Sequence, residues 1–263
     1  MLKKSYLMII LFFLYAPIAV LIVFSFNAYT TVGAWGGFSL QWYRALLNDR
    51  QIGSAVYNTV TIGLLSATAA SVIGTLAAVG INNMRSGRKK IILGINSIPV
   101  ANPDIVTGVS LLILYIWVFR FMGAGQLGYM TLLLAHIAFN IPYVILSVLP
   151  RFKYMNEYIY EAAQDLGASP VYAFTRVVIP QLMPGIITGW ILAFTLSVDD
   201  FMVSFFTTGS GVSNLSLVIF AMSRRGVNPM INALSTIMFV VVITLLFVVN
   251  MRDSKKLKAQ RGG

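Results

Sequence analysis

Six long apolar segments, separated by short polar gaps, dominate the pattern of the chain. They cover residues 7–26, 56–81, 91–119, 127–149, 185–206 and 231–250. Each is long enough to cross a bilayer as a helix that rises about 1.5 Å per residue. A lone span in lipid must satisfy its own backbone hydrogen bonds, and no alternating strand pattern is present. The pattern therefore predicts an all-α integral membrane protein with six transmembrane helices.

Two of these segments carry further detail. The second has small residues spaced three and four apart, which predicts one helix face that another helix can approach closely. Those residues are Gly63, Ala67, Ala70, Ser71, Gly74 and Ala78. The third is interrupted near its middle by polar residues and prolines between Asn96 and Asp104. Broken helices within a membrane are tolerated only where they are buried in protein or line a cavity.

Composition and charge agree with a membrane protein. Of the 263 residues, 58% are hydrophobic and 10% are charged, whereas soluble domains carry roughly 25% charged residues. The net charge of +11 does not indicate nucleic-acid binding, because the basic residues fill the gaps and the chain ends instead of following a solvated helix face. The apolar segment after Lys3 and Lys4 is too long for a signal-peptide core, so we expect an uncleaved first helix.

The basic residues also predict the orientation. If the N-terminus is cytoplasmic, 14 of the 19 lysines and arginines lie on the cytoplasmic side. This bias follows the positive-inside rule. We therefore expect a multi-pass protein of the plasma or inner membrane with both termini in the cytoplasm.

Several chemical functions find no support in the sequence. There are no cysteines, which excludes disulfides and thiol chemistry. Residues 123–128 match GxGxxG but lie between two apolar helices without a βαβ unit, and no GxxxxGK[ST] phosphate loop is present. His136 stands alone in the fourth segment, which favours a hydrogen-bonded packing role over a metal site. We expect no catalytic residues, no metal site and no cofactor bound by this chain.

The longest internal polar segment, residues 150–179, predicts a compact helical knob on the cytoplasmic side. Residues 157–166 combine good helix formers with an apolar stripe, and Gly167 supplies a left-handed stop. Ser169 and Pro170 then read as the N-cap and first residue of a second helix. A plain amphipathic helix at the membrane surface is the alternative.

The same segment resembles a known family. Glu161-Ala162-Ala163, with Gly167 four residues later and Ile179-Pro180 beyond, is similar to the EAA loop of binding-protein-dependent ABC importer permeases, although the family has leucine at the position of Ile179. The resemblance implies a type I ABC importer permease fold, one permease domain over residues 1–263 and insertion of the short helix into a cleft of a cytoplasmic ATPase. The coupling residues it implies are Glu161, Ala162, Ala163, Asp165 and Gly167.

The family resemblance also implies the partners. They are a second, similar permease subunit, two ATPase subunits that bind ATP and magnesium, and an extracytoplasmic solute-binding protein. The chain itself would then be a permease and not an enzyme. Three segments, 102–106, 161–169 and 193–200, are together similar to the permeases of spermidine/putrescine importers, which implies a polyamine as the solute.

Three carboxylates within the spans fit a cationic solute. Asp104, Asp199 and Asp200 are the acids expected at membrane depth, where an uncompensated carboxylate costs a few kcal/mol or more. Spaced carboxylates with apolar and aromatic walls suit polyamines, and Trp190 and Tyr115 could line the same path. The alternative is structural. Asp104 could cap the half-helix after Pro103, Asp199 or Asp200 could bond polar groups on a neighbouring helix, and the aromatic residues could serve in packing or at the membrane interface.

Other functions remain open at this point. An ABC permease for another small solute would share the EAA loop. A secondary transporter or channel would share the broken helix and buried acids but would not explain that loop. A membrane scaffold would need neither the broken helix nor the buried acids.

Overall fold

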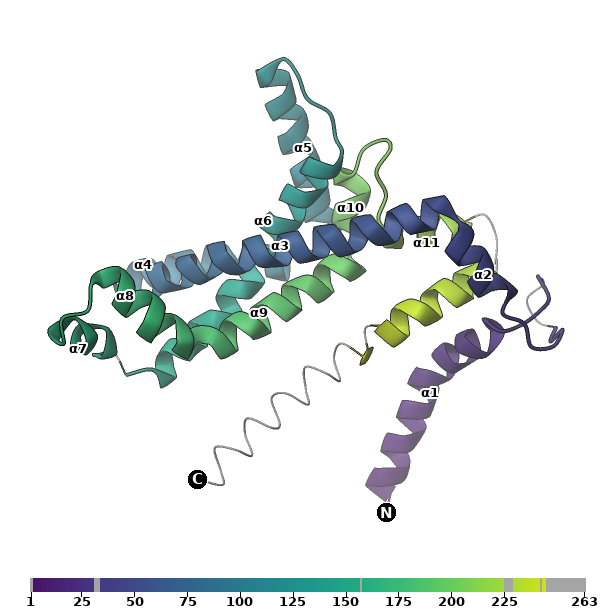
Figure 1. Cartoon of the computed structure of the whole chain (residues 1–263), viewed down its shortest axis with the longest axis horizontal. Coiled ribbons are helices and arrows are strands. Elements are labelled where there is room, and N and C mark those ends of the chain that lie inside the picture. The colour runs from purple at the N-terminus through teal and green to yellow at the C-terminus, as the bar shows by residue number, and fades with distance from the viewer. Residues whose placement is uncertain (1, 31–33, 157, 225–228, 242, 245–263) are drawn as a thin grey trace. The chain divides into compact units, whose positions relative to one another are not determined.

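The computed structural model describes residues 2–30, 34–156, 158–224, 229–241 and 243–244. Within these ranges the chain is helical (Figure 1), apart from its loops and one isolated antiparallel bridge between Asn27 and Phe38. The helices in the first half are α1 Leu2–Phe24, α2 Gln41–Asn48, α3 Arg50–Asn82, α4 Ser86–Ala101, α5 Asp104–Met122 and α6 Tyr129–Val148. The remainder are η1 Leu149–Tyr154, α7 Ile159–Asp165, α8 Pro170–Ala173, η2 Phe174–Val178, α9 Ile179–Asp199, α10 Met202–Thr207, α11 Leu215–Arg224 and an apolar helix at Pro229–Val241.

The membrane-spanning character predicted from the sequence is confirmed. Among the described residues, five helices are long and apolar enough to cross a membrane, namely Tyr6–Phe24, Arg50–Asn82, Asp104–Met122, Tyr129–Tyr154 and Pro170–Asp199. The sixth predicted segment, 231–250, lies partly outside the described residues. Of its described part, residues 231–241 belong to the helix at Pro229–Val241. The chain divides into two compact units, Met1–Ser54 with Val218–Gly263 and Ala55–Leu217.

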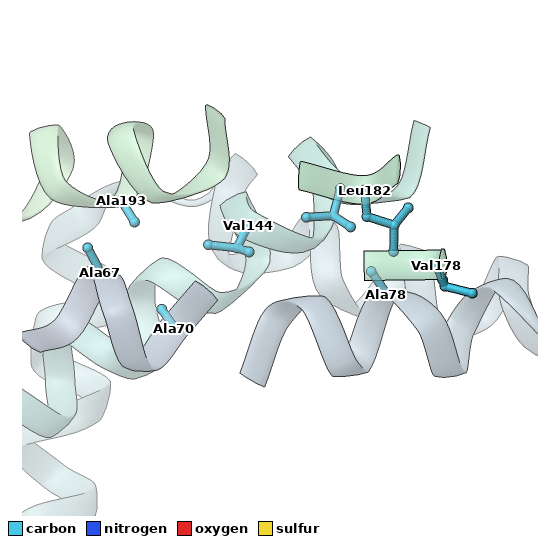
Figure 2. Close-up of a cluster of buried hydrophobic side chains, with 8 residues drawn as sticks. Ala67, Ala70, Ala78, Val144, Val178, Leu182 and Ala193 are labelled. Carbon is cyan, nitrogen blue, oxygen red and sulfur yellow. The ribbon is translucent and has the colours of Figure 1, made fainter. Parts of the chain in front are cut away.

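The second unit, Ala55–Leu217, is built around α3, α6 and α9. Its largest core cluster joins residues from these helices and from the turn before α9, and Figure 2 shows their side chains converging. The cluster consists of Ala67, Ala70, Ala78, Val144, Val148, Val178, Leu182 and Ala193. Small residues dominate the α3 side of this cluster, as the predicted close-packing face of the second segment requires.

Glycine permits the closest approach in this core. A Cβ added to Gly74 of α3 would lie 2.8 Å from Val144 of α6, and one added to Gly189 of α9 would lie 3.2 Å from the Val144 Cα. Both separations are shorter than ordinary van der Waals contact. Lipid offers no hydrophobic force between helices, so such close packing supplies much of the attraction.

The third and fifth apolar segments are not single helices. The third breaks at Asn102 and Pro103, both in extended conformation, as the polar interruption predicts. For the fifth, the expected span of 185–206 is wrong at both ends, because one helical rod runs from Pro170 to Asp199 and ends there. The predicted second helix of the knob is therefore the beginning of this span. Pro180 lacks an N–H group, and the π-helical turn Phe174–Val178 just before it accommodates the missing hydrogen bond.

In the first unit, α1 is apolar on all sides. None of the residues in its most apolar window is buried within the described structure. The short α2 follows, with Leu46 buried, and Asp49 caps the start of α3 by accepting hydrogen bonds from the backbone N–H of Gln51 at 2.8 Å and of Ile52 at 3.2 Å.

Candidate functional site

The knob between η1 and α9 ends its short helix with a left-handed glycine, as predicted. Gly167 has φ of +89°. Its N–H donates to the carbonyl of Gln164 at 2.8 Å, and the N–H of Ala168 donates to the carbonyl of Ala163 at 3.1 Å. These two bonds form a Schellman motif, which satisfies carbonyls that the helix end leaves free. The turn depends on the positive φ, which a residue with a Cβ adopts only at a cost.

The restart of the chain also follows the prediction. The hydroxyl of Ser169 accepts a hydrogen bond from the N–H of Tyr172 at 3.3 Å, and Pro170 is the first helical residue. Glu157, part of the predicted helix, lies outside the described residues, and α7 begins at Ile159.

One face of the knob packs on the protein and the other is open. Tyr160 and Phe174 pack against the α3–α6–α9 core, together with Phe152 and Met155. Other side chains of the knob are large, apolar and exposed, most of all Leu166 at 90%. The others are Tyr154, Tyr158, Val171 and Tyr172. The implied coupling residues Glu161, Ala162, Asp165 and Gly167 are likewise exposed, and Ala163 is half-buried.

The break after α9 is held by Asp200. Its side chain is 3% exposed. One carboxylate oxygen accepts from the N–H of Val203 at 3.2 Å, and the other accepts from the N–H and the hydroxyl of Ser204, both at 2.7 Å. The carboxylate therefore caps the first N–H groups of α10 from the residue before its N-cap, Phe201. This is a structural role, but not the hydrogen bond to a neighbouring helix that the sequence left open for Asp200.

His136 of α6 completes this capping group. The Ser204 hydroxyl gives its single proton to Asp200 and accepts from the side-chain amide of Asn214 at 2.6 Å. The His136 Nε2, 3.0 Å from the same oxygen, must therefore be a donor, which assigns its proton to Nε2. The hydrogen-bonded packing role predicted for His136 is confirmed. Its Nδ1 is buried with no hydrogen-bond partner among the described residues.

A second polar group lies before the break. The side-chain amide of Asn140, one turn beyond His136 on α6, donates to the Ser197 hydroxyl of α9 at 2.7 Å. Ser197 in turn shares a 2.9 Å hydrogen bond with Ser66 of α3. Two side chains of α6 thus hold the chain on both sides of the break, at Ser197 and at Ser204. Asp199 lies between these two points.

Asp104 and Asp199 differ from Asp200 because both are exposed. Among the described residues, neither carboxylate has a hydrogen bond or an ion pair. Asp104 is the first residue of α5, where the sequence allowed a capping role, but the N-terminus of α5 has no side-chain cap. Asp199 is the last residue of α9.

The two aromatic candidates, Trp190 and Tyr115, pack on different clusters. Trp190 packs against the α3–α6–α9 core, stacks on Phe194 with centroids 5.6 Å apart, and donates from its indole to the Thr68 hydroxyl at 3.1 Å. Tyr115 packs against a cluster of Ala135, Phe139 and Val203, and its hydroxyl donates to the Thr131 carbonyl at 3.0 Å. Both rings are half-buried, so each keeps a partly open face.

The sequence prediction missed most of the polar residues around the break. Asn140, Ser197, Ser204 and Asn214 are all buried and hydrogen-bonded to one another or to their neighbours. The available signal was that His136 and Asn140 are four residues apart in an otherwise apolar segment, and so share a helix face. No cluster of three or more potential metal ligands occurs in the part of the chain that the structure describes.

The apolar helices and the knob are features of a known class of membrane protein. Comparison of the chain with known protein families identifies that class. Residues 70–251 match the family described as binding-protein-dependent transport system inner membrane component, and the chain belongs to that family. It is the membrane permease component of an ABC importer, a multi-pass membrane protein. This class of component is not itself an enzyme.

Two curated relatives and one solved structure show which members of the class this chain is similar to. The chain is 41% identical over 232 residues to the putrescine transport system permease protein PotI of Escherichia coli (strain K12), covering 86% of this chain and 81% of PotI. It is 37% identical over 262 residues to the spermidine/putrescine transport system permease protein PotC of the same strain, covering 100% and 97%. A chain of a bacterial alginate ABC transporter in complex with an alginate pentasaccharide-bound periplasmic protein superposes with a TM-score of 0.69 at 20% identity, covering 94% and 91%. At that identity the superposition shows a shared fold alone.

Proposed function

We propose that this chain forms half of the translocation path of an ATP-driven polyamine importer. The observation that carries the proposal concerns Asp104 and Asp199. Each carboxylate is exposed at the break of an apolar helix and has no ion pair with any described residue. An unpaired carboxylate at membrane depth is costly unless it faces a cavity or a cation. The similarity to permeases named for putrescine and spermidine supports a cationic solute.

Helix dipoles distinguish the two acids. Asp104 lies at the N-terminus of α5, where the partial positive charge of the helix stabilises an anion. Asp199 lies at the C-terminus of α9, where the dipole adds to its negative charge. Asp199 is therefore the stronger candidate for contact with an ammonium group. Asn140 and His136 position it by fixing the chain on either side.

Asp200 acts as a cap in this proposal and not as a ligand. Its carboxylate oxygens are occupied by three donors from α10. Trp190 and Tyr115 contribute only their open faces to the wall of the path, because their polar atoms are already bonded within the protein.

Energy comes from a partner in this proposal. The exposed face of the knob, with Glu161, Ala162 and Leu166 among its residues, docks into an ATPase subunit that binds ATP and magnesium. Two such ATPases, a second permease and an extracytoplasmic binding protein complete the importer, and the whole chain acts as one permease domain. Closure of the ATPase pair moves the knobs together and rocks the helices from inward-open to outward-open.

The orientation in this proposal has both termini and the knob in the cytoplasm, as the positive-inside bias indicates. The chain contains no cysteine, so a single cysteine at position 161 can be labelled without background. We expect labelling from the cytoplasmic side only. If an impermeant reagent added outside intact cells labels this cysteine, the knob is on the outer side and the predicted topology is wrong.

The path itself is tested by charge removal. Asp104→Asn and Asp199→Asn keep the side-chain size while removing an attraction of about 1–4 kcal/mol for an ammonium group at about 4 Å. Uptake of radiolabelled spermidine or putrescine at low concentration should fall about tenfold or more, with the larger loss for Asp199→Asn.

Asp49→Asn is the matched control for these variants. Asp49 is also an acid beside a helix end, but it caps α3, and asparagine caps about as well as aspartate. We expect uptake by this variant to equal that of the parent. If Asp104→Asn and Asp199→Asn also transport normally at equal expression, these carboxylates do not contact the solute.

A further inference from the structure

The segment between α1 and α3 is held together by buried polar bonds. Asn27, 1% exposed, donates from its side-chain amide to the Ala34 carbonyl and accepts from the Gly36 N–H, both at 2.7 Å. The indole of Trp42 in α2 donates to the Asn27 carbonyl at 2.7 Å. One buried asparagine thus ties the loop to itself and to the following helix.

An aromatic stack adds to this framework. The Phe26 ring stacks on Phe38 with centroids 5.2 Å apart and on Tyr43 with centroids 5.1 Å apart. The Tyr43 hydroxyl and the fully buried Ser25 share a 2.7 Å hydrogen bond. The hydrogen bonds and the ring stack therefore fix the backbone that carries the exposed large side chains of this segment.

Six residues with exposed side chains in this segment make up what we call the 29–47 surface. They are Tyr29, Trp35, Phe38, Leu40, Arg44 and Leu47. Phe38 is 70% exposed and Leu47 is 86% exposed. Leu40, Arg44 and Leu47 are four and three residues apart, so they share one face at α2, whereas Leu46 is buried.

We propose that the 29–47 surface rests in the headgroup region of the membrane and that Arg44 contacts lipid phosphate there. The first reason is continuity with the spans. α1 ends at Phe24 and α3 begins at Arg50, and both helices are candidate spans, so the segment leaves and re-enters the bilayer at one surface.

The second reason is the chemistry of the surface. Tyrosine and tryptophan concentrate where one end of a side chain meets lipid and the other meets water, and a short amphipathic helix with leucine and arginine on one face lies well in that plane. Arginine extends its charged end toward headgroups while its stem covers apolar surface. The nearby acid, Asp49, does not oppose this, because its carboxylate caps α3.

A depth measurement tests the inference. In the assembled importer, reconstituted into liposomes that contain phosphatidylglycerol, a nitroxide label is attached at a single cysteine at position 47 or 38. A label at position 12, exposed on the apolar span α1, serves as the lipid reference. A label at position 86, exposed in the polar turn that begins α4, serves as the water reference. Power saturation with oxygen and with a water-soluble nickel chelate gives the depth of each label.

We expect the labels at 47 and 38 to be more accessible to oxygen than to nickel, with a depth between the two references. The label at 47 should shift outward when phosphatidylcholine replaces the anionic lipid, and Arg44→Gln should remove that shift. Position 47 is the safer of the two, because Phe38 also supports the stack. Nickel accessibility equal to that at position 86 overturns the inference. The inference also fails if the labels at 47 and 38 lose accessibility to both oxygen and nickel only when the solute-binding protein is added. That result would make the 29–47 surface a protein-docking surface.

Discussion

Asp199 and Asp200 are adjacent in sequence but meet different surroundings. The Asp200 carboxylate accepts three hydrogen bonds from Val203 and Ser204, whereas that of Asp199 is exposed at the end of α9. The sequence identified both residues as acids at membrane depth. It could not separate their roles, because the separation depends on where α9 ends.

Asp200→Asn should destabilise the protein. The variant retains one oxygen and places an amide NH2 group at the position of the other, so in either orientation at least one backbone N–H of Val203 or Ser204 loses its acceptor. Each buried donor left without an acceptor costs about 1–3 kcal/mol. We expect a lower thermal unfolding temperature for the purified chain, measured in lipid nanodiscs.

Asp199→Asn is the comparison for this variant and should unfold at the parent temperature, because its carboxylate has no hydrogen bond among the described residues. If Asp200→Asn instead keeps its unfolding temperature and loses polyamine uptake, Asp200 faces the path and the capping interpretation fails.

The buried polar residues show the limit of single-residue reasoning. A lone His136 in an apolar segment predicts a hydrogen-bonded packing role, and the bond to Ser204 confirms it. The partner itself is not predictable, because Ser204 is 68 positions away and only the folded chain brings the two together. The same holds for Asn140 and Ser197.

At the scale of elements, local signals predicted the knob well. Its stop at Gly167, its N-cap at Ser169 and its proline at the next position are short-range features, and each occurs as expected. The ends of the fifth span were predicted less well. Apolar composition continues from α9 through α10, so hydropathy alone does not reveal the break that Asp200 makes.

Gly167→Val should uncouple transport without preventing insertion. The φ of +89° at this position is unfavourable for any residue with a Cβ and most of all for a β-branched one, at a cost of order 1–3 kcal/mol. The end of α7 should then reorient, which reduces solute-stimulated ATP hydrolysis by the assembled importer. Membrane levels of the chain should match those of the parent.

Gly167→Asn is the matched rescue, since asparagine tolerates the left-handed conformation better than other residues. It should restore most of the stimulated ATP hydrolysis. If the valine variant hydrolyses ATP and takes up solute at the rates of the parent, the turn at Gly167 does not set the coupling geometry.

At the scale of the whole molecule, membership of the importer permease family accounts for several features together. The apolar helices, the knob with an exposed apolar face and the absence of a phosphate loop in the sequence all fit a component that receives its energy from a partner. The sequence pattern predicted this class of protein, because long apolar segments and one local motif are enough to recognise the class. Which helices contact one another depended on packing details such as Gly74 against Val144.

Reconstitution tests the central claim most directly. The chain is assembled with its second permease and ATPase subunits in proteoliposomes, and the solute-binding protein is added outside. We predict uptake of radiolabelled spermidine or putrescine that requires both internal ATP and the binding protein. Uptake that persists without ATP, or transport of a neutral or anionic solute with neither polyamine moved, would contradict the account.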